Sequence, residues 1–512
     1  MTPNITASAA VSRWLHFATL AFLVLGAGLR IYHWSTGRSL WVDEAYLAVN
    51  VQTRTLGSLL QPLEYNQSAP YLFLAGTDVL TSVLGYDERV LRLLPLVASL
   101  LSLALFWQLA KLCLNRWVLP LAVAAISFSY PLVYYAQELK HYALEVMVVV
   151  LVLYLVARLQ ASPAEAPARF RHLWWAGALG LFAAHTAPFV LAGAGLTALL
   201  GKLRRDLPLS WTALTVGAIG WGALFCVNYW FFIRPNYLNP FMQQFWAFAH
   251  PGAPWTMSGL RSWVFLSNEY LSYVGYSGGF KILFGGAVLL GMLQAWRTRS
   301  LVMVAAVIGL GSYGFAVLIG KAPFAGRLAL FLFPMALLLA AHGLGCSTGR
   351  WSLRALRIGA GLLLLVPAAS QLRRSVQPVV VQNQREAIAY LVAHRQPDEP
   401  VHVIFQAQPA LRFYRSRAED VQANYIFGSE TRVWARGPGH HPKIRPDMEI
   451  LLQELHQLAA RPVFWVLTGH MYELEAEMLK AIESTFGHVS TERYQDHGAG
   501  AFKFERQRTA QR

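Results

Sequence analysis

Asp43 and Glu44 form an adjacent pair of carboxylates in the stretch SLWVDEAYLAV, which follows a long apolar run. A carboxylate close to lipid costs free energy unless it is solvated, paired with a cation or bound to a metal ion. Such a pair can accept a proton from a hydroxyl group or hold a divalent cation. It can also simply open a helix, because the helix dipole favours acidic residues at its N-terminus. The pair alone is therefore compatible with chemistry and with a solvated helix start.

A second cluster of polar residues lies in YYAQELKHYALEV, at 134–146, between two apolar runs. It contains the amide of Gln137, the carboxylate of Glu138, the amine of Lys140 and the phenol of Tyr142. Groups of this kind can bind a charged substrate or take part in proton transfer. An ordinary polar turn between two helices, with an internal Glu–Lys pair, accounts for the same residues.

Two further stretches carry candidate binding residues. Lys321 and Arg327 lie in GKAPFAGRLALFLFP, at 320–334, near the ends of two apolar runs. They could anchor the chain at the membrane surface, or they could form a cationic pocket for a phosphate, which a guanidinium group binds with two hydrogen bonds. His185, in AAHTAP, is a candidate for metal or phosphate binding, although a histidine near a helix end often serves only as a hydrogen-bond partner.

The composition indicates which elements must position these residues. The chain has 512 residues, of which 55% are hydrophobic and 14% charged, so much of its surface must face lipid. The formal charge of +16 does not indicate nucleic-acid binding, because the basic residues lie in short loops between apolar runs. The three cysteines stand far apart in apolar runs and fit neither a disulfide framework nor a metal site: Cys113, Cys226 and Cys346.

We predict an all-α polytopic membrane protein with about eleven spanning helices, since a span needs about 20 mostly apolar residues. Pro188 and His185 would be awkward at the middle of a bilayer, so the apolar stretch 173–201 is divided into two short helices. The predicted spans lie at 14–34, 90–110, 117–133, 142–158, 173–185, 187–201, 211–232, 280–296, 301–319, 328–346 and 356–371.

The positive-inside rule gives the orientation. With a cytoplasmic N-terminus, every cytoplasmic loop carries at least two basic residues. These are Lys111, Arg116, Arg158, Arg169, Arg171, Lys202, Arg204, Arg205, Arg297, Arg299, Arg350, Arg354 and Arg357. Eight of the eleven acidic residues before position 386 then fall on the outer face: Asp43, Glu44, Glu64, Asp78, Asp87, Glu88, Glu138 and Glu269. The orientation thus predicts a functional site on the outer face.

The composition changes after about residue 375. Residues 376–512 hold 16 of the 27 acidic residues and no long apolar run. Predicted strands at 399–406 and 462–469 alternate with predicted helices, which indicates a small α/β domain. We therefore divide the chain into a membrane domain, 1–375, and an extracytoplasmic domain, 376–512. In the membrane domain, the outer loop 35–89 carries the Asp–Glu pair.

The polar stretches follow one another in the order of a known family. LWVDEAY, NQSAPYLFLAGTDVLTSVLGYDERVLRLLP, YYAQELKHYAL, FAAHTAPFVL and GRLALFLFPMALLLAAHGL resemble successive motifs of the GT-C superfamily of membrane glycosyltransferases. The likeness is greatest to the bacterial group related to protein O-mannosyltransferases and to the aminoarabinose transferase of lipid A. The sequence departs from the family pattern at Ala69, Lys140, Gly326 and Leu328.

The resemblance implies a glycosyltransferase of the inner or plasma membrane that takes a sugar from a polyprenyl-phosphate donor at the outer face. The acceptor would be a lipid, a glycan or a protein. An inverting transfer needs a carboxylate base, for which we choose Asp43, and cations for the leaving phosphate. Glu44 and Glu138 would position the acceptor, and Asp43 and Glu44 could hold a divalent metal ion. The expected substrate-binding residues are Lys140, Arg327, Arg92, Gln137, Tyr142 and His185.

No organic cofactor is expected, and nucleic acid is not an expected partner. The aromatic stretch 228–248 could lie along the membrane surface as a lid over the site or serve only as an interfacial belt. Two other functions remain open from the sequence. A transporter or flippase of lipid-linked saccharides would need polar residues through the midplane. A non-catalytic protein could keep the same scaffold.

Overall fold

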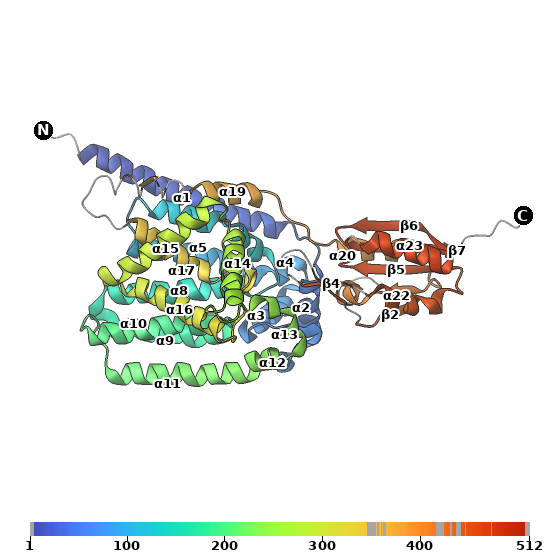
Figure 1. Ribbon diagram of the computed structural model, residues 1–512, viewed down its shortest axis with the longest axis horizontal. Coiled ribbons are helices and arrows are strands. Elements are labelled where there is room, and N and C mark those ends of the chain that lie inside the picture. Colours follow the sequence, from blue (N-terminus) through green and yellow to red (C-terminus); the bar gives the residue numbers. More distant parts are fainter. Residues whose placement is uncertain are drawn as a thin grey trace, which may run out of the picture.

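The chain folds into a helical body and a smaller sheet domain that projects from one end of it, as the computed structural model in Figure 1 shows. The structure describes residues 5–345, 365–415, 424–430, 433–436, 442–445, 447–472 and 474–506, with residues 355, 358, 359 and 361. Cys346 and the predicted cytoplasmic residues Arg350, Arg354 and Arg357 lie outside these ranges.

Among the described residues, six helices are long and apolar enough to cross a membrane, or seven if one bent pair counts as a single span. Four of the six are α5 (Leu93–Cys113), α8 (Tyr142–Ala161), α15 (Gly279–Arg297) and α16 (Leu301–Leu318). The fifth is Ser12–Ser35, within α1 (Ile5–Ser35), and the sixth is Trp211–Tyr237, which begins with α11 (Trp211–Asn228). The bent pair is α6 (Leu119–Phe128) with α7 (Tyr130–Tyr134) and the short turn after it. Three shorter helices are also apolar: α3 (Tyr71–Leu84), α10 (Ala187–Leu203) and α17 (Leu332–Gly345). The helices α9 (Ala166–Ala183) and α19 (Leu365–Ser375) belong to the body as well.

Each predicted span overlaps one of these helices, although 356–371 is described only in part, and the polytopic all-α class is confirmed. The count of eleven spans stays a prediction. The predicted division of 173–201 is confirmed, since α9 ends at Ala183 and α10 begins at Ala187. Pro188 fits there because the first turn of a helix leaves its N–H groups unpaired in any case. His185 lies in the break.

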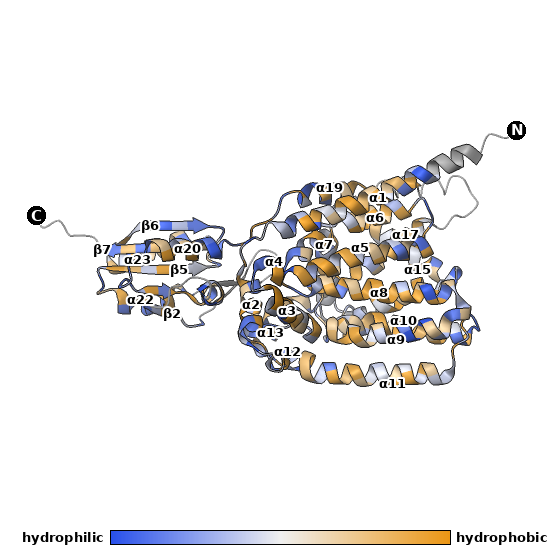
Figure 2. Cartoon of the chain, turned by 180° about the vertical axis from the view of Figure 1, so that it is seen from behind, coloured by the Kyte–Doolittle hydropathy of each residue, from blue (hydrophilic) through white to orange (hydrophobic). Residues whose placement is uncertain are grey.

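Large apolar side chains on the helical body are exposed, which fits contact with lipid rather than water. Ile219 on α11 is 67% exposed and Ile282 on α15 is 80% exposed. Figure 2 shows hydrophobic residues along the full length of the helices in the body. The protein is therefore an integral membrane protein, as predicted.

Helices α15 and α17 approach closely where Gly291 faces the backbone of Leu339. A Cβ atom at Gly291 would lie 1.9 Å from the carbonyl oxygen of Leu339. We expect Gly291→Ala to destabilise the protein by about 1–3 kcal/mol, the usual cost of overpacking. Thermal unfolding in detergent would measure this effect. Gly286→Ala is the matched control on the same helix, because nothing lies within 4 Å of its Cβ position. Equal melting temperatures for the two variants would contradict the close packing.

Short helices gather at the end of the body that faces the sheet domain. Figure 1 places α2 (Val42–Thr53), α3, α12 (Arg234–Tyr237) and α13 (Pro240–Phe245) there, and the N-terminus at the opposite end. The four-residue helix α4 (Glu88–Leu91) and the helix α14 (Met257–Tyr273) also lie in segments that connect the spans. The predicted outer stretches around Asp43, Glu138 and Arg327 therefore converge on one end of the body.

The sheet domain contains a mixed sheet with the strand order β2-β1-β5-β7-β6. Strands β1 (Val401–Val403), β2 (Tyr425–Phe427) and β5 (Val463–Gly469) are parallel, and β7 (Ala499–Arg506) pairs antiparallel with β5 and with β6 (His488–Asp496). Its helices are α20 (Gln384–His394), α21 (Gln408–Arg415), α22 (Met448–Leu455) and α23 (Leu474–Phe486). A separate hairpin joins β3 (Val433–Arg436) and β4 (Pro442–Arg445).

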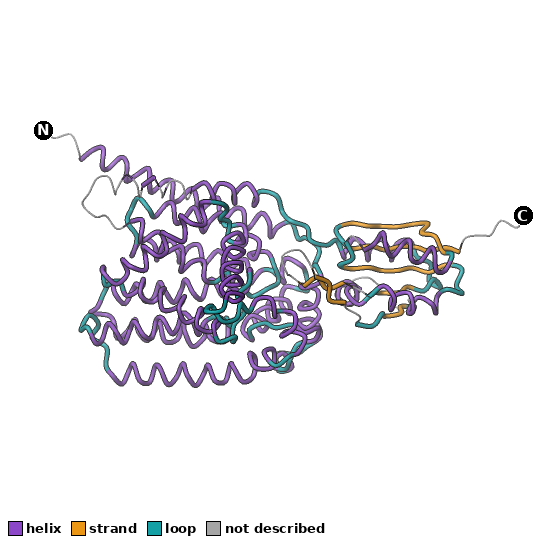
Figure 3. The backbone as a smooth tube through the Cα atoms, viewed as in Figure 1, coloured by secondary structure: helices purple, strands orange, loops and turns teal. Residues whose placement is uncertain are grey.

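The predicted α/β domain is confirmed, since both predicted strands and the helices after them are present. Figure 3 shows the five-stranded sheet apart from the helical body, whereas the hairpin of β3 and β4 lies at the edge of the body. The hairpin of β6 and β7 and the helix α20 were not predicted. Strand β6 (HVSTERYQD) contains few apolar residues, so its sequence lacks the pattern that identifies a strand. Strand β7 also pairs with β5, and there Phe504 stacks on Phe464.

Candidate functional site

A cavity of about 1220 Å³ lies where the helical body meets the sheet domain. Every predicted polar stretch contributes to its lining, and so does the sheet domain. The lining residues come from 41–46, 65–68, 140–145, 185–189, 225–250, 313–328, Gln406, 470–472 and Leu474. Pockets of this size can enclose much of a lipid-linked ligand, so the cavity is the candidate site.

Asp43 lies at the polar end of this cavity, in the first turn of α2. Its Oδ2 accepts a hydrogen bond of 2.9 Å from Nη1 of Arg327 and lies 3.7 Å from Nζ of Lys140. Nζ of Lys140 also donates to Oε1 of Gln67 over 2.8 Å. The sequence left open whether Asp43 merely starts a helix or does chemistry. In the structure it lies in the first turn of α2 and also lines the cavity.

The two cations dominate the ionisation of Asp43. Burial on its own raises the pKa of this carboxyl, but Lys140 and Arg327 outweigh burial and lower the pKa to about 2. Asp43 is therefore a carboxylate at any ordinary pH in the ligand-free protein. Burial also lowers the pKa of Lys140, whereas Asp43 opposes that change.

Arg327 is held in place by aromatic rings as well as by Asp43. Its guanidinium carbon lies 5.8 Å from the ring centre of Tyr142 and 5.8 Å from that of Trp246. Arg327 belongs to a short 3-10 turn (Gly326–Ala329), and Gly326 adopts a φ of +28°, which favours glycine at this position. The guanidinium group is thus presented to the cavity at a fixed position.

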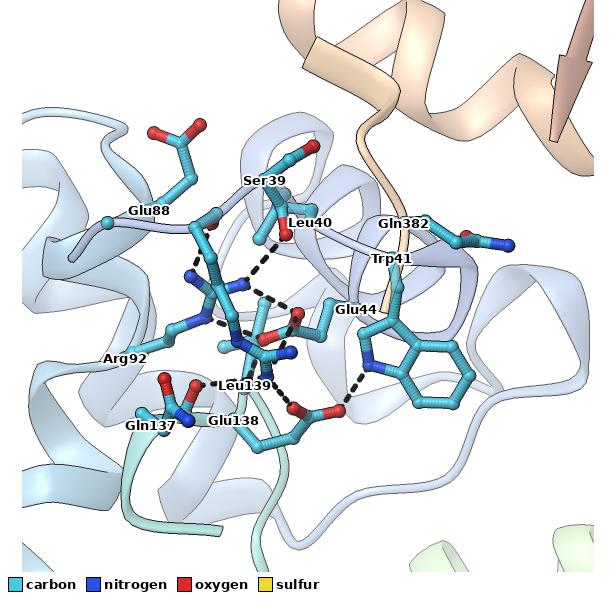
Figure 4. A network of polar contacts seen from close by, with 12 residues as sticks. Ser39, Leu40, Trp41, Glu44, Glu88, Arg92, Gln137, Glu138, Leu139 and Gln382 are labelled. Carbon is cyan, nitrogen blue, oxygen red and sulfur yellow. Dashed lines mark hydrogen bonds and ion pairs between the residues drawn. The ribbon is translucent and has the colours of Figure 1, made fainter. Parts of the chain in front are cut away.

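Glu44 points away from the cavity into a buried network of charges (Figure 4). Its two oxygens accept hydrogen bonds of 2.7 and 2.6 Å from Arg92, and Oε1 also accepts 2.8 Å from the backbone N–H of Leu139. Glu138 accepts hydrogen bonds from Arg38 and from the indole of Trp41. The network ties the loop before α2 to the turn that carries Lys140.

Burial and the nearby carboxylate of Glu44 raise the pKa of Glu138 to about 7, against the opposing effect of Arg38. The pKa of Glu44 is lowered, since Arg92 and Arg38 together outweigh its burial. The pKa values of the two carboxyl groups are therefore shifted in opposite directions, although both groups belong to one network.

The structure divides the predicted site residues into two groups. Asp43, Lys140, Tyr142, His185 and Arg327 line the cavity, whereas the others lie outside its lining: Glu44, Arg92, Gln137 and Glu138.

The predicted role of Arg92 in phosphate binding needs correction. Its guanidinium group is fully buried and donates to Glu44 and to the backbone oxygens of Arg38 and Ser39. Gln137 is buried too, with its amide 3.1 Å from Nδ1 of His33. Both side chains are buried and lie outside the cavity lining, so they support the site from behind.

The predicted metal ion between Asp43 and Glu44 does not fit this arrangement. The two side chains face different surroundings, and Arg92 already occupies both oxygens of Glu44. Asp43 faces Lys140 and Arg327, which would repel a cation. Among the described residues, no three His, Cys, Asp or Glu side chains are placed to hold a metal ion.

A second polar group lies further along the cavity wall. Nε2 of His141 is 3.7 Å from a carboxylate oxygen of Glu145, and the ring centres of His141 and His185 are 5.6 Å apart. Burial lowers the pKa of His185 to about 4, so this ring is neutral at ordinary pH. His141 and Glu145 had no role in the sequence prediction, which singled out only their neighbours.

The aromatic stretch 228–248 forms one wall of the cavity, with Tyr229, Tyr237, Phe245 and Trp246 in the lining. Nζ of Lys321 reaches this wall and donates to the hydroxyl of Tyr237 over 2.8 Å. The stretch thus belongs to the site, and its action as a lid stays a prediction.

Sequence reasoning missed the contribution of the sheet domain. His470 and Tyr472 line the cavity and adopt positive φ values of 61° and 41°, and Tyr65 and Asn66 on the opposite wall do the same with 61° and 54°. Non-glycine residues in this conformation are strained, and such strain concentrates at functional sites. No local sequence signal marks these positions, because the strain arises from the tertiary packing.

Comparison with known proteins relates this architecture to solved structures. No protein-family profile matches the sequence, and no curated protein matches it. The structure resembles ArnT from Cupriavidus metallidurans bound to undecaprenyl phosphate, with a TM-score of 0.53 and 14% identity over 94% of this chain and 98% of that one. The apo state of the same protein gives 0.50 and 13% over 95% and 98%.

The oligosaccharyltransferase of Archaeoglobus fulgidus in its apo form gives a TM-score of 0.51 and 11% identity, over 97% of this chain and 75% of that one. These proteins are GT-C glycosyltransferases. The predicted resemblance is confirmed at the level of the fold: the chain is built like a GT-C membrane glycosyltransferase.

Proposed function

We propose that the protein is a membrane glycosyltransferase that moves a sugar from a polyprenyl-phosphate donor to an acceptor hydroxyl or phosphate, with inversion and with Asp43 as the base. The observation that carries this proposal is the contact of one carboxylate, Asp43, with two cations, Lys140 and Arg327, at the polar end of a large cavity. A base and a phosphate-binding pair are thus adjacent, as the transfer requires.

The cavity has a polar end and apolar walls, which match the phosphate and the hydrocarbon chain of a lipid phosphate. Its polar end carries Lys140 and Arg327, and its walls carry aromatic side chains, among them Phe189, Phe225 and Trp246. Arg327 suits a phosphate because a planar guanidinium group can donate two parallel hydrogen bonds. The ArnT structure, which contains undecaprenyl phosphate, supports the assignment of a lipid phosphate to this chain.

In the transfer, the acceptor oxygen attacks the anomeric carbon of the sugar while the bond from that carbon to the phosphate oxygen breaks. The proton of the acceptor hydroxyl goes to Asp43, and the electron pair of the broken bond goes to the phosphate. Lys140 and Arg327 stabilise the charge that develops there. Attack opposite the departing phosphate inverts the anomeric centre.

Donor binding itself would activate the base. A pKa of about 2 makes Asp43 a weak base in the ligand-free protein. A phosphate that draws Lys140 and Arg327 toward itself removes the contacts that lower this pKa, and the burial that remains raises it. Asp43 therefore becomes more basic when the donor is in place.

Glu44 and Glu138 support the site in this proposal and do not act on the substrate. Glu44 accepts from the N–H of Leu139, next to Lys140, and is itself adjacent to Asp43. The pair Glu44–Arg92 thus fixes the separation of base and cation. No step in the transfer requires a metal ion at Asp43 and Glu44.

We further propose that residues 1–375 form the transferase domain and that residues 376–512 form an extracytoplasmic domain. Those basic loops assigned to the cytoplasm that the structure describes, such as that between α10 and α11, lie at the end of the body away from the sheet domain (Figure 1). The positive-inside rule then places the cavity and the sheet domain on the outer face of the inner or plasma membrane.

The test of the donor assignment is Arg327→Gln. We expect this variant to weaken the binding of undecaprenyl phosphate to the purified protein at least about tenfold, since a charge-assisted hydrogen bond contributes about 1.5–3 kcal/mol. Arg116→Gln, an exposed arginine at the other end of the body, is the control and should bind like the wild type. Unchanged binding by Arg327→Gln would remove Arg327 from the phosphate site.

Turnover separates the enzyme from a protein that only binds lipid. The wild-type protein in detergent, given a polyprenyl-phosphate-linked sugar and a mixture of envelope lipids and glycans, should release the free polyprenyl phosphate. Tight binding without any release would favour the non-catalytic scaffold.

A further inference from the structure

His470 enters the cavity from the sheet domain, just after β5 ends at Gly469. It lies close enough to Asp43 for that carboxylate to influence its ionisation. Asp43, Lys140 and Arg327, in contrast, come from the helical body. The position of His470 therefore raises the question of whether the sheet domain takes part in substrate binding.

The hydrogen bonds around Gln382 determine which nitrogen of His470 carries the proton. Oε1 of Gln382 accepts a hydrogen bond of 2.8 Å from the backbone N–H of Val42, and this donor fixes the orientation of the amide. The amide nitrogen of Gln382 lies 3.0 Å from Nδ1 of His470, so it must donate to that atom. Nδ1 is consequently the acceptor nitrogen, and the neutral ring carries its hydrogen on Nε2.

The ring is also held neutral. A proton on Nδ1 would face the N–H group of Gln382, and burial lowers the pKa of His470 although Asp43 opposes this. Gln382 itself is completely buried, so the relay from Val42 through Gln382 to His470 is shielded from water. These two hydrogen bonds connect Val42, the residue before Asp43, to the imidazole of His470 through Gln382.

The backbone of His470 supports a functional role. Its φ of 61° is unfavourable for a residue with a side chain, and the neighbouring Tyr472 shares this property. The hydroxyl of Tyr472 donates to the backbone oxygen of Val381, next to Gln382. The backbone is thus strained at the position from which His470 enters the cavity.

We propose that His470 is a substrate-binding residue of the site and that its Nε2–H donates a hydrogen bond to the phosphate of the lipid donor, alongside Lys140 and Arg327. The sheet domain is then part of the active site and not an accessory. This inference rests on the proposed function, because the phosphate belongs to the donor named there.

The geometry predicts which substitution preserves the contact. The amide nitrogen of a glutamine can take the place of Nε2, whereas that of an asparagine takes the place of Nδ1. We expect His470→Ala and His470→Asn to weaken the binding of undecaprenyl phosphate to the purified full-length protein about tenfold, and His470→Gln to retain most of the affinity. A purely structural histidine would not produce this order.

Docking of the sheet domain does not depend on His470. The hydroxyl of Tyr414 accepts from the N–H of Leu40 over 2.9 Å, and Arg385 is paired with Glu88 over 2.9 Å. His394→Ala, an exposed histidine on α20, is the matched control and should bind like the wild type.

The outcomes separate the two proposals. Loss of binding in His470→Ala with recovery in His470→Gln supports the inference. If the wild type and His470→Ala bind equally while Arg327→Gln loses binding, the donor site stands and the role of His470 is overturned. If the wild type binds no undecaprenyl phosphate, both proposals fail. Loss of binding in all three His470 variants, with unchanged melting temperatures, would overturn the assignment of the hydrogen to Nε2.

Discussion

Asp43→Asn is expected to reduce sugar transfer by about 10²–10⁴-fold, the contribution usual for a general base. The amide keeps the shape of the side chain but cannot accept the proton of the acceptor hydroxyl. Asparagine can still accept a hydrogen bond from Arg327, which lies 2.9 Å from the carboxylate in the native protein. The measurement is the rate at which a polyprenyl-phosphate-linked sugar is consumed by the purified variant.

Donor binding distinguishes a lost base from a damaged site. Asp43 is the counter-ion of Lys140 and Arg327, so its neutralisation leaves both cations available to a phosphate. Asp43→Asn should therefore bind undecaprenyl phosphate as tightly as the wild type, or more tightly. Asp206→Asn, an exposed aspartate between α10 and α11, is the control for the chemical change and should transfer sugar at the wild-type rate. Near-normal transfer by a folded Asp43→Asn variant would exclude Asp43 as the base.

Glu44→Gln is expected to destabilise the fold by about 3–5 kcal/mol, because it leaves the charge of Arg92 buried without its partner. Glu44 is completely buried, Arg92 is 1% exposed, and the two side chains share hydrogen bonds of 2.7 and 2.6 Å. Thermal unfolding in detergent should show a clearly lowered melting temperature. Arg92→Met should also lower the melting temperature, since it removes the nearer of the two arginines that pair with Glu44 and leaves only Arg38, at 3.9 Å.

The double variant tests whether the pair acts as a unit. Glu44→Gln combined with Arg92→Met should lower the free energy of unfolding by less than the sum of the single changes. The reason is that the double variant contains neither charge of the pair, so neither is buried without the other. Glu165→Gln is the matched control: this glutamate pairs with Arg169 over 2.9 Å, but its side chain is 66% exposed. Exposed pairs contribute about 0–1 kcal/mol, so its melting temperature should change little. A similar, small effect in both pairs would contradict the structural role assigned to Glu44.

Several features of this protein could be predicted from the sequence because they depend on short-range patterns. The length and hydropathy of the apolar runs predicted the helices, and Pro188 predicted the break in the stretch 173–201. The alternation of strands and helices after residue 398 predicted the α/β domain. The resemblance identified Asp43, Lys140 and Arg327, which the structure brings together in one cavity.

Other features depended on the tertiary structure. Asp43 and Glu44 are adjacent in sequence, and both were expected to act on the substrate, yet neighbouring side chains on a helix point in different directions. Only the packing of α2 against the buried Arg92 determined that Glu44 lies in a buried network and that Asp43 faces the cavity. The same holds for His470, which lies 427 positions after Asp43 and reaches the cavity through the docking of a second domain. Local sequence patterns determine which elements form, but the contacts between distant elements determine which of their charged side chains remain free to do chemistry.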